Sequence, residues 1–118
     1  MDPACGPEPL IRTAELRILR LCRPPGLRIE GVVDLRTHRH LRTALDVIAP
    51  TDGDLQLELS RLEYLDIGGL RMLISFAGTR DEGHHVELTG LAPHLRNVIA
   101  LVGWDETPGL RLGAHRAN

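Results

Sequence analysis

The sequence lacks lysine entirely and has few aromatic residues. All 14 of its basic side chains are arginines, and Tyr64, Phe76 and Trp104 are the only aromatic residues among 118. With so little aromatic volume, the hydrophobic core must be built from Leu, Ile, Val and Ala. The net charge of −2 gives no general attraction to nucleic acid or to an acidic membrane, so we expect neither as a partner.

Long apolar runs are also missing. No segment approaches the roughly 20 apolar residues that a membrane-spanning helix needs. The first ten residues, MDPACGPEPL, have neither the charged nor the apolar region of a signal peptide. We therefore expect a cytoplasmic protein.

Cysteine is scarce as well, with Cys5 and Cys22 as the only two. Their spacing matches no metal or redox motif, and we interpret them as two reduced thiols. A disulfide between them is the alternative, which nothing in the sequence favours.

The residues of common catalytic and metal sites are absent or badly spaced. His38 and His40 are expected to point to nearly opposite sides of a helix, and the adjacent His84 and His85 are expected to diverge at the start of a strand. We interpret these histidines as solvated surface or capping residues and expect no bound metal. The sequence also lacks a Gly-x-Ser-x-Gly motif, a Walker loop and a dinucleotide fingerprint, so we expect neither an enzyme nor a cofactor.

Strand and helix patterns alternate along the rest of the chain. Residues 1–12 contain three prolines and are expected to form a flexible N-terminal arm, followed by a single domain over residues 13–118. Alternating apolar residues predict strands over 15–21, 27–35, 55–62, 84–91 and 109–113, the first two joined as a hairpin around Pro-Pro-Gly. Apolar stripes predict helices over 37–49, capped by Thr37, and over 68–80 and 92–103. The buried stripes are expected at Leu41, Leu45 and Ile48, at Leu70, Leu73, Ile74 and Ala77, and at Leu95, Val98, Ile99 and Val102.

The order of these elements is β-β-α-β-α-β-α-β. Strands that alternate with helices of about a dozen residues imply an α/β fold, with a mixed, mainly parallel sheet of about five strands and helices packed on it.

The stretch LEYLDIGGLRML places an acid and two glycines where a strand gives way to a helix. Backbone N–H groups at a helix start are unpaired, and the helix dipole favours negative charge there, so this junction could accept a carboxylate or phosphate from a partner. The alternative is purely structural. Asp66 would then cap the helix by accepting hydrogen bonds from Gly68 or Gly69, and the glycines would permit a tight turn.

Three segments of the sequence resemble the STAS domain family. They are GVVDLRTHRHLRTAL, LELSRLEYLDIGGLRMLISF and VELTGLAPHLRNVIALVGWDE, and the resemblance extends over residues 15–112. The family is the fold of bacterial anti-sigma-factor antagonists, so the resemblance implies a non-enzymatic module that regulates transcription by partner switching. Its partner would be a kinase-like anti-sigma factor, and its binding face would comprise Asp66, Ile67, Gly68, Gly69, Arg71 and Ser75.

In antagonists of this family, the partner phosphorylates the second serine of an Asp-Ser-Ser-Gly segment and thereby breaks the complex. Residues 66–69 take these four positions here, and Gly68, at the phosphorylated position, has no hydroxyl group. We therefore expect no phosphorylation at Gly68. Ser60 and Thr89, expected at strand ends near the same sheet edge, are weaker candidates, with turn capping as their alternative role.

The resemblance leaves two other functions open: a STAS subunit of an ABC lipid-transport system and a nucleotide-binding STAS sensor. It also implies a fourth helix at the C-terminus, where this chain has only AHRAN after Gly113. Apolar surface left uncovered there would be filled by the N-terminal arm or by a second copy of the chain, and we expect a weak homodimer.

Overall fold

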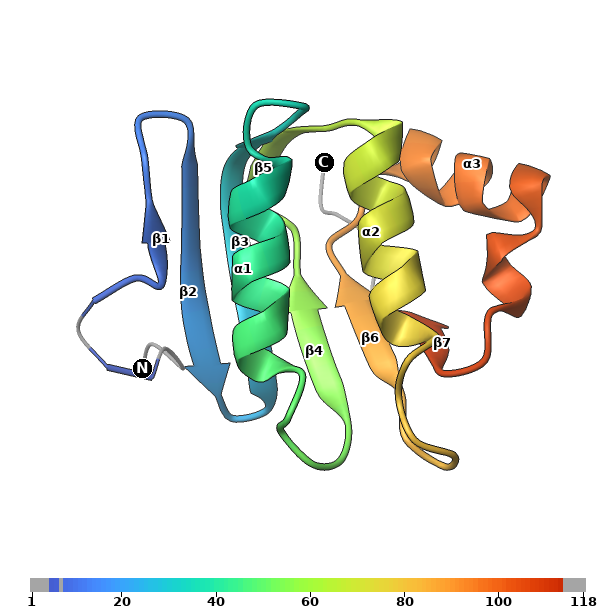
Figure 1. Cartoon of the computed structure of the whole chain (residues 1–118). Coiled ribbons are helices and arrows are strands. Elements are labelled where there is room, and N and C mark those ends of the chain that lie inside the picture. The colour runs from blue at the N-terminus through green and yellow to red at the C-terminus, as the bar shows by residue number, and fades with distance from the viewer. Residues whose placement is uncertain (1–4, 7, 114–118) are drawn as a thin grey trace.

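The computed structural model describes residues 5, 6 and 8–113, which form one mixed sheet with three α-helices (Figure 1). The strands are β1 (Ile11–Arg12), β2 (Leu16–Cys22), β3 (Pro25–Val33), β4 (Leu55–Glu58), β5 (Leu62–Leu65), β6 (Val86–Thr89) and β7 (Leu110–Leu112). The helices are α1 (His38–Ile48), α2 (Ile67–Ala77) and α3 (Pro93–Val102), followed by a short 3-10 turn, η1 (Trp104–Glu106).

The sheet has the order β1-β2-β3-β4-β6-β7, with β5 paired to the far end of β3. The pairs β1–β2 and β2–β3 are antiparallel, and all the others are parallel. The predicted α/β class, the mixed, mainly parallel sheet and the hairpin at Pro-Pro-Gly are therefore confirmed. The strand count is seven in place of about five.

One additional strand arises because the predicted strand over 55–62 is broken. A turn interrupts it, in which the Ser60 amide donates to the Glu58 carboxylate at 2.9 Å and the Leu62 amide donates to the Leu59 carbonyl at 3.1 Å. The chain then pairs again with β3 as β5. The nine-residue β3 is long enough to hold β4 and β5 one after the other.

The other additional strand lies inside the segment that we expected to be a flexible arm. Ile11 faces Ile18 in an antiparallel pair, and the Leu10 amide donates to the Ile18 carbonyl at 2.8 Å. Leu10 and Ile11 also pack against the core. The end of the predicted arm therefore belongs to the sheet.

Cys5 and Cys22 are paired as a disulfide in the structure, with Cα atoms 5.3 Å apart, which favours the alternative that the sequence left open. The cause is the course of the N-terminal segment. Because it runs antiparallel to β2 and the Cys5 amide donates to the Arg20 carbonyl at 2.6 Å, residue 5 lies beside the end of that strand. The spacing of the two cysteines in the sequence gives no sign of this pairing.

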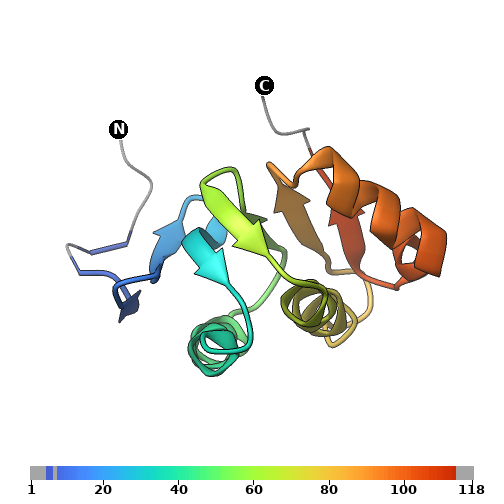
Figure 2. The same cartoon turned by 90° about the horizontal axis from the view of Figure 1, so that it is seen from above.

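Helices α1 and α2 lie side by side on one face of the sheet, and α3 lies at its β7 end (Figures 1 and 2). All the apolar positions predicted for the first two helices are buried. In α3, Leu95 and Ile99 are buried, but Val102 is 53% exposed, which corrects its predicted place in the stripe. The last turn of α3 extends past β7, so it has no sheet to pack against (Figure 1).

The opposite face of the central strands is charged. In β3 the buried Leu27 and Ile29 alternate with Arg28 and Glu30, and Arg28 pairs with Glu58 of β4 at 3.4 Å. Glu30 in turn lies 3.5 Å from Arg17 of β2. The central strands alternate in polarity because α1 and α2 cover only one of their faces (Figure 2), whereas parallel strands buried on both faces are usually continuously apolar.

Arg80, just after α2, holds the loop that connects α1 to β4. Its guanidinium group donates to the carbonyl oxygens of Ala49 at 3.0 Å and Gly53 at 2.7 Å, and also to that of Thr51. These carbonyls come from the end of α1 and the residues after it, where backbone acceptors have no helical partner. One side chain thus fixes the spacing between α1 and α2 at the end away from the helix starts.

We expect Arg80→Ala to lower the free energy of unfolding by about 2 kcal/mol, because three carbonyl groups lose a charged donor at once. Urea unfolding followed by circular dichroism measures this. Arg71→Ala is the control, since Arg71 is exposed, and it should change stability by less than about 0.5 kcal/mol. Equal losses in the two variants would contradict the role assigned to Arg80.

Candidate partner-binding site

The candidate site lies at the edge of the sheet where the parallel strands end. β5 ends at Leu65 and α2 begins at Ile67, and beside them β3 runs through a short loop into α1. The Asp66 amide donates to the Val33 carbonyl at 3.0 Å and ties these two junctions together. The starts of α1 and α2 are therefore neighbours, at the top of Figure 1.

Asp66 caps α2. Its Oδ1 accepts a hydrogen bond from the Gly69 amide at 2.7 Å, and its extended backbone is typical of an N-cap residue. The capping interpretation of Asp66 is thus confirmed, with Gly69 as the donor. One of the free amides at the helix start is satisfied within the chain.

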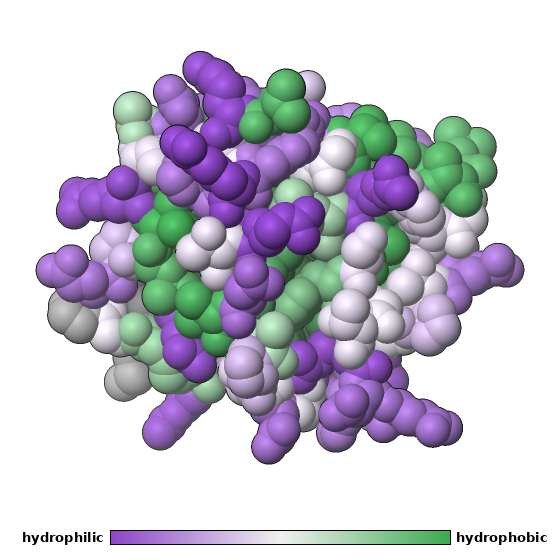
Figure 3. Space-filling model, in the orientation of Figure 1, coloured by the Kyte–Doolittle hydropathy of each residue, from purple (hydrophilic) through white to green (hydrophobic). Residues whose placement is uncertain are grey.

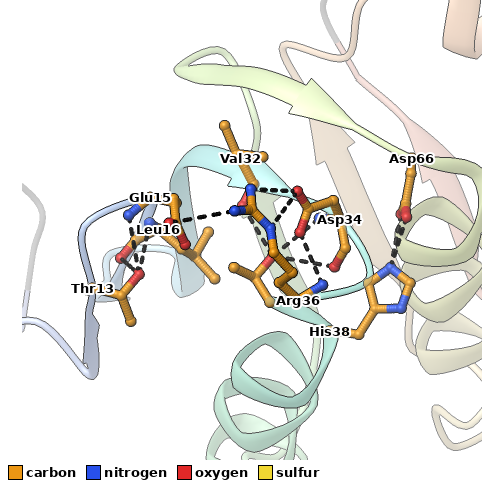
Figure 4. A network of polar contacts seen from close by, with 9 residues as sticks. Thr13, Glu15, Leu16, Val32, Asp34, Arg36, His38 and Asp66 are labelled. Carbon is orange, nitrogen blue, oxygen red and sulfur yellow. Dashed lines mark hydrogen bonds and ion pairs between the residues drawn. The ribbon is translucent and has the colours of Figure 1, made fainter.

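The same carboxylate also contacts His38, the first residue of α1. His38 Nε2 lies 2.8 Å from Asp66 Oδ1 and 3.0 Å from Oδ2, as Figure 4 shows. Only 22% of the His38 side chain and 23% of the Asp66 side chain are exposed. We predicted a solvated or capping role for His38 and did not predict this contact. The sequence could have suggested it, because His38 and Asp66 are both expected at the starts of helices, at the same edge of the sheet.

The predicted binding residues divide into exposed and buried groups. Ile67 is 51% exposed, and Gly68, Arg71 and Ser75 are also exposed. Gly69 is buried, and a Cβ atom added there would lie 2.5 Å from Val33 Cγ1. Gly69 therefore serves the packing of α2 on the sheet.

A groove of about 670 Å³ runs between α1 and α2. Its polar lining includes two arginines, Arg42 and Arg71, one aspartate, Asp46, and the imidazole of His38. Its floor is apolar, and it is lined by Leu45, Met72 and Phe76. Figure 3 shows this helical face, on which hydrophilic side chains surround smaller hydrophobic areas.

The loop from β3 to α1 is held by its own polar contacts (Figure 4). Arg36 donates to the Asp34 carboxylate at 2.9 and 3.3 Å, and this hydrogen bonding holds the pKa of Asp34 below its usual value. Thr37 precedes α1 as predicted but makes no capping bond. Its hydroxyl instead donates to the Val32 carbonyl and accepts from the Asp34 amide, each at 3.0 Å. Thr37 thus closes the loop.

The two candidate phosphorylation sites lie at neighbouring strand ends. β6 ends at Thr89, and the Leu59 amide, just after β4, donates to the Thr89 carbonyl at 2.8 Å. Ser60 is exposed, but the Thr89 hydroxyl oxygen is buried and has no hydrogen-bond partner within residues 5, 6 and 8–113. A kinase could therefore reach Ser60 and not Thr89 in this conformation.

His84, His85 and Asp54 lie close together beside the start of β6. His85 Nδ1 and His84 Nδ1 lie 3.2 and 3.6 Å from the same oxygen of Asp54, so these rings converge where we expected them to diverge. The backbone hydrogen bond from His85 lowers the pKa of Asp54.

Within the part of the chain that the structure describes, no three His, Cys, Asp or Glu residues are grouped so that they could hold a metal ion. No helix in the same part is long and apolar enough to cross a membrane.

The chain as a whole is similar to known proteins. The family model described as "Mlab, STAS domain" matches residues 21–112. Among solved structures, an anti-sigma factor antagonist from Mycobacterium paratuberculosis is similar, with a TM-score of 0.62 and 26% sequence identity. The match covers 74% of this chain and 75% of that one. No curated protein sequence matches the chain.

Proposed function

Because the chain belongs to the STAS domain family, we propose that it is a non-enzymatic regulatory module that binds a kinase-like anti-sigma factor through the start of α2. The similarity to an anti-sigma factor antagonist supports a regulatory protein-binding role. The finer assignment, to transcription control by partner switching in a bacterium, rests on the same similarity.

The observation that carries this proposal is the exposure of Ile67. An isoleucine that is 51% exposed stands at the tip of α2, beside Gly68, which has no side chain. Arg71 and Ser75 continue the exposed face along the helix. An apolar side chain that is exposed in the free chain is stabilised when a partner covers it, so Ile67 is suited to a protein–protein contact.

We further propose that phosphorylation does not switch this binding off, since residue 68, at the position phosphorylated in the family, is a glycine without a hydroxyl group. The test is to purify the kinase-like anti-sigma factors encoded in the source genome and to titrate each against the fluorescently labelled chain, with ADP and then with ATP. We expect one of them to bind equally well with either nucleotide, and mass spectrometry to find no added phosphate. A phosphate on Ser60 together with weakened binding would contradict this proposal.

A second candidate is a STAS subunit of an ABC lipid-transport system. The same glycine favours it, because a docking tip without a hydroxyl group needs no kinase as its partner. The same titration with the ATPase subunits of the organism's ABC transporters separates the two functions. Binding to such a subunit, and to no kinase-like protein, would establish the second candidate.

The proposed role belongs in the cytoplasm, where sigma factors act. Disulfides are rare in cytoplasmic proteins, so the redox state of Cys5 and Cys22 in cells tests this location. Cells quenched in acid and alkylated before lysis should yield the chain with both thiols modified if the protein is cytoplasmic. Recovery of the intact disulfide would place the protein in an oxidising compartment.

We also propose weak homodimerisation. The five residues after Gly113 lie outside the described part of the chain, but α3 ends with Leu101 and Val102, which are 85% and 53% exposed. Burying these side chains against a second copy would remove apolar surface from water. A pure monomer in sedimentation equilibrium at high micromolar concentration would reject this proposal.

A further inference from the structure

Gly68 lies against the ring of His38. A Cβ atom added at residue 68 would lie 2.7 Å from His38 Cε1 and 3.4 Å from Nε2. The first of these distances is shorter than nonbonded carbon atoms allow. The imidazole therefore occupies the space that any side chain at residue 68 would need first.

The ring is also held in place. Its Nε2 contacts both oxygens of the Asp66 carboxylate, and the same carboxylate caps α2 through the Gly69 amide. If the ring swung away to admit a side chain at residue 68, it would give up both of its contacts with Asp66. Asp66, 23% exposed, would then lose a partner beside a helix start.

Backbone conformation does not explain the glycine. Gly68 is absent from the glycines with a positive φ, so its helical backbone suits any residue. Alanine is ordinarily better than glycine inside a helix. What sets this position apart from an ordinary helical one is therefore its contact with the neighbouring ring.

We propose that His38 excludes any side chain from residue 68 and so keeps the docking tip in a single, unmodifiable state. The regulatory part of this inference rests on the proposed function. A serine introduced at residue 68 meets the imidazole and disturbs the His38–Asp66 contact. Restoring control by phosphorylation requires changes at residues 38 and 68 together.

A thermal double-mutant cycle on the isolated chain tests the steric part. Gly68→Ala is expected to lower the melting temperature by about 4 °C in the native background. In the His38→Ala background, the same change should leave the melting temperature unchanged or raise it, because the obstacle is gone and the helix gains a better residue. Equal effects in both backgrounds would overturn the proposal.

Nitrogen chemical shifts of the His38 ring provide a second readout, which stands even if one variant folds poorly. We expect the Nε2 signal to lose its hydrogen-bonded shift in Gly68→Ala. The control is Ser75→Ala, a substitution farther along α2 in the same groove, which should keep this shift. An unchanged Nε2 signal in Gly68→Ala would overturn the steric part.

The regulatory part is tested with the kinase-like protein found by titration, and with ATP. Gly68→Ser alone should remain unphosphorylated, while His38→Ala combined with Gly68→Ser should gain a phosphate at residue 68 that weakens binding at least tenfold. Equal phosphorylation of both variants would overturn the role of His38. No phosphate on either variant would overturn the regulatory part alone, and the absence of any binding partner would reject the proposed function, with the thermal cycle unaffected.

Discussion

Gly26→Ala is expected to leave most of the chain unfolded. Gly26 lies in β3, and a Cβ atom added there would lie 1.7 Å from the carbonyl oxygen of Gln56 in β4. The obstacle is backbone, so no rotation of a side chain relieves it. β3 and β4 would have to separate in the middle of the sheet. We expect a cost of more than about 4 kcal/mol, which is close to the entire stability of a small domain.

Urea unfolding followed by far-ultraviolet circular dichroism measures this loss. Gly53→Ala is the matched control, because Gly53 also has a positive φ, +86°, but an added Cβ there meets nothing within 4 Å. Gly53→Ala should therefore lower the free energy of unfolding only by the backbone strain of a positive φ, about 1–2 kcal/mol. Similar losses of stability in the two variants would contradict the proposal that Gly26 is needed for the close approach of β3 to β4.

Ile67→Asp is expected to weaken binding of the partner identified by titration by roughly 30-fold, which corresponds to about 2 kcal/mol. The reason is that the contact would bury a carboxylate where it now buries an alkyl group. The fold should not suffer, since Ile67 is 51% exposed and an acid at a helix start is favourable. Isothermal titration calorimetry measures the affinity, and thermal unfolding checks the fold.

Val47→Asp is the control for this measurement. Val47 is another exposed apolar residue, but it lies near the end of α1 and outside the proposed face. Its replacement should leave the affinity unchanged. If both variants bind like the native chain, the proposed binding face at the start of α2 is wrong. If both lose affinity equally, the loss comes from the added negative charge and not from the position of the substitution.

The order and type of the main elements could be predicted because each follows from a local pattern. Period-two alternation marks β2 and β3, and a proline pair with a glycine marks the turn between them. The two unpredicted strands carry too little pattern. β1 has only two residues, and the apolar series of β4 continues through Leu59 and Leu62, which conceals the turn before β5.

The site could be predicted as far as its contacts are local. The cap from Asp66 to Gly69 spans three residues, so the sequence alone suggests it. The contact between His38 and Asp66 spans 28 residues and exists only because α1 and α2 start side by side. The burial of Gly69 likewise depends on Val33, which comes from a different strand. Local patterns carry no information about such neighbours.

The link between Cys5 and Cys22 joins two points that lie 17 residues apart along the chain, with β1 and most of β2 between them. A protease that nicks this span once therefore leaves both fragments attached through sulfur. On a non-reducing gel the nicked chain runs as one band, and it separates into two only after a reductant is added. Limited proteolysis under the two conditions thus reports cuts within the first antiparallel pair separately from cuts in the rest of the chain.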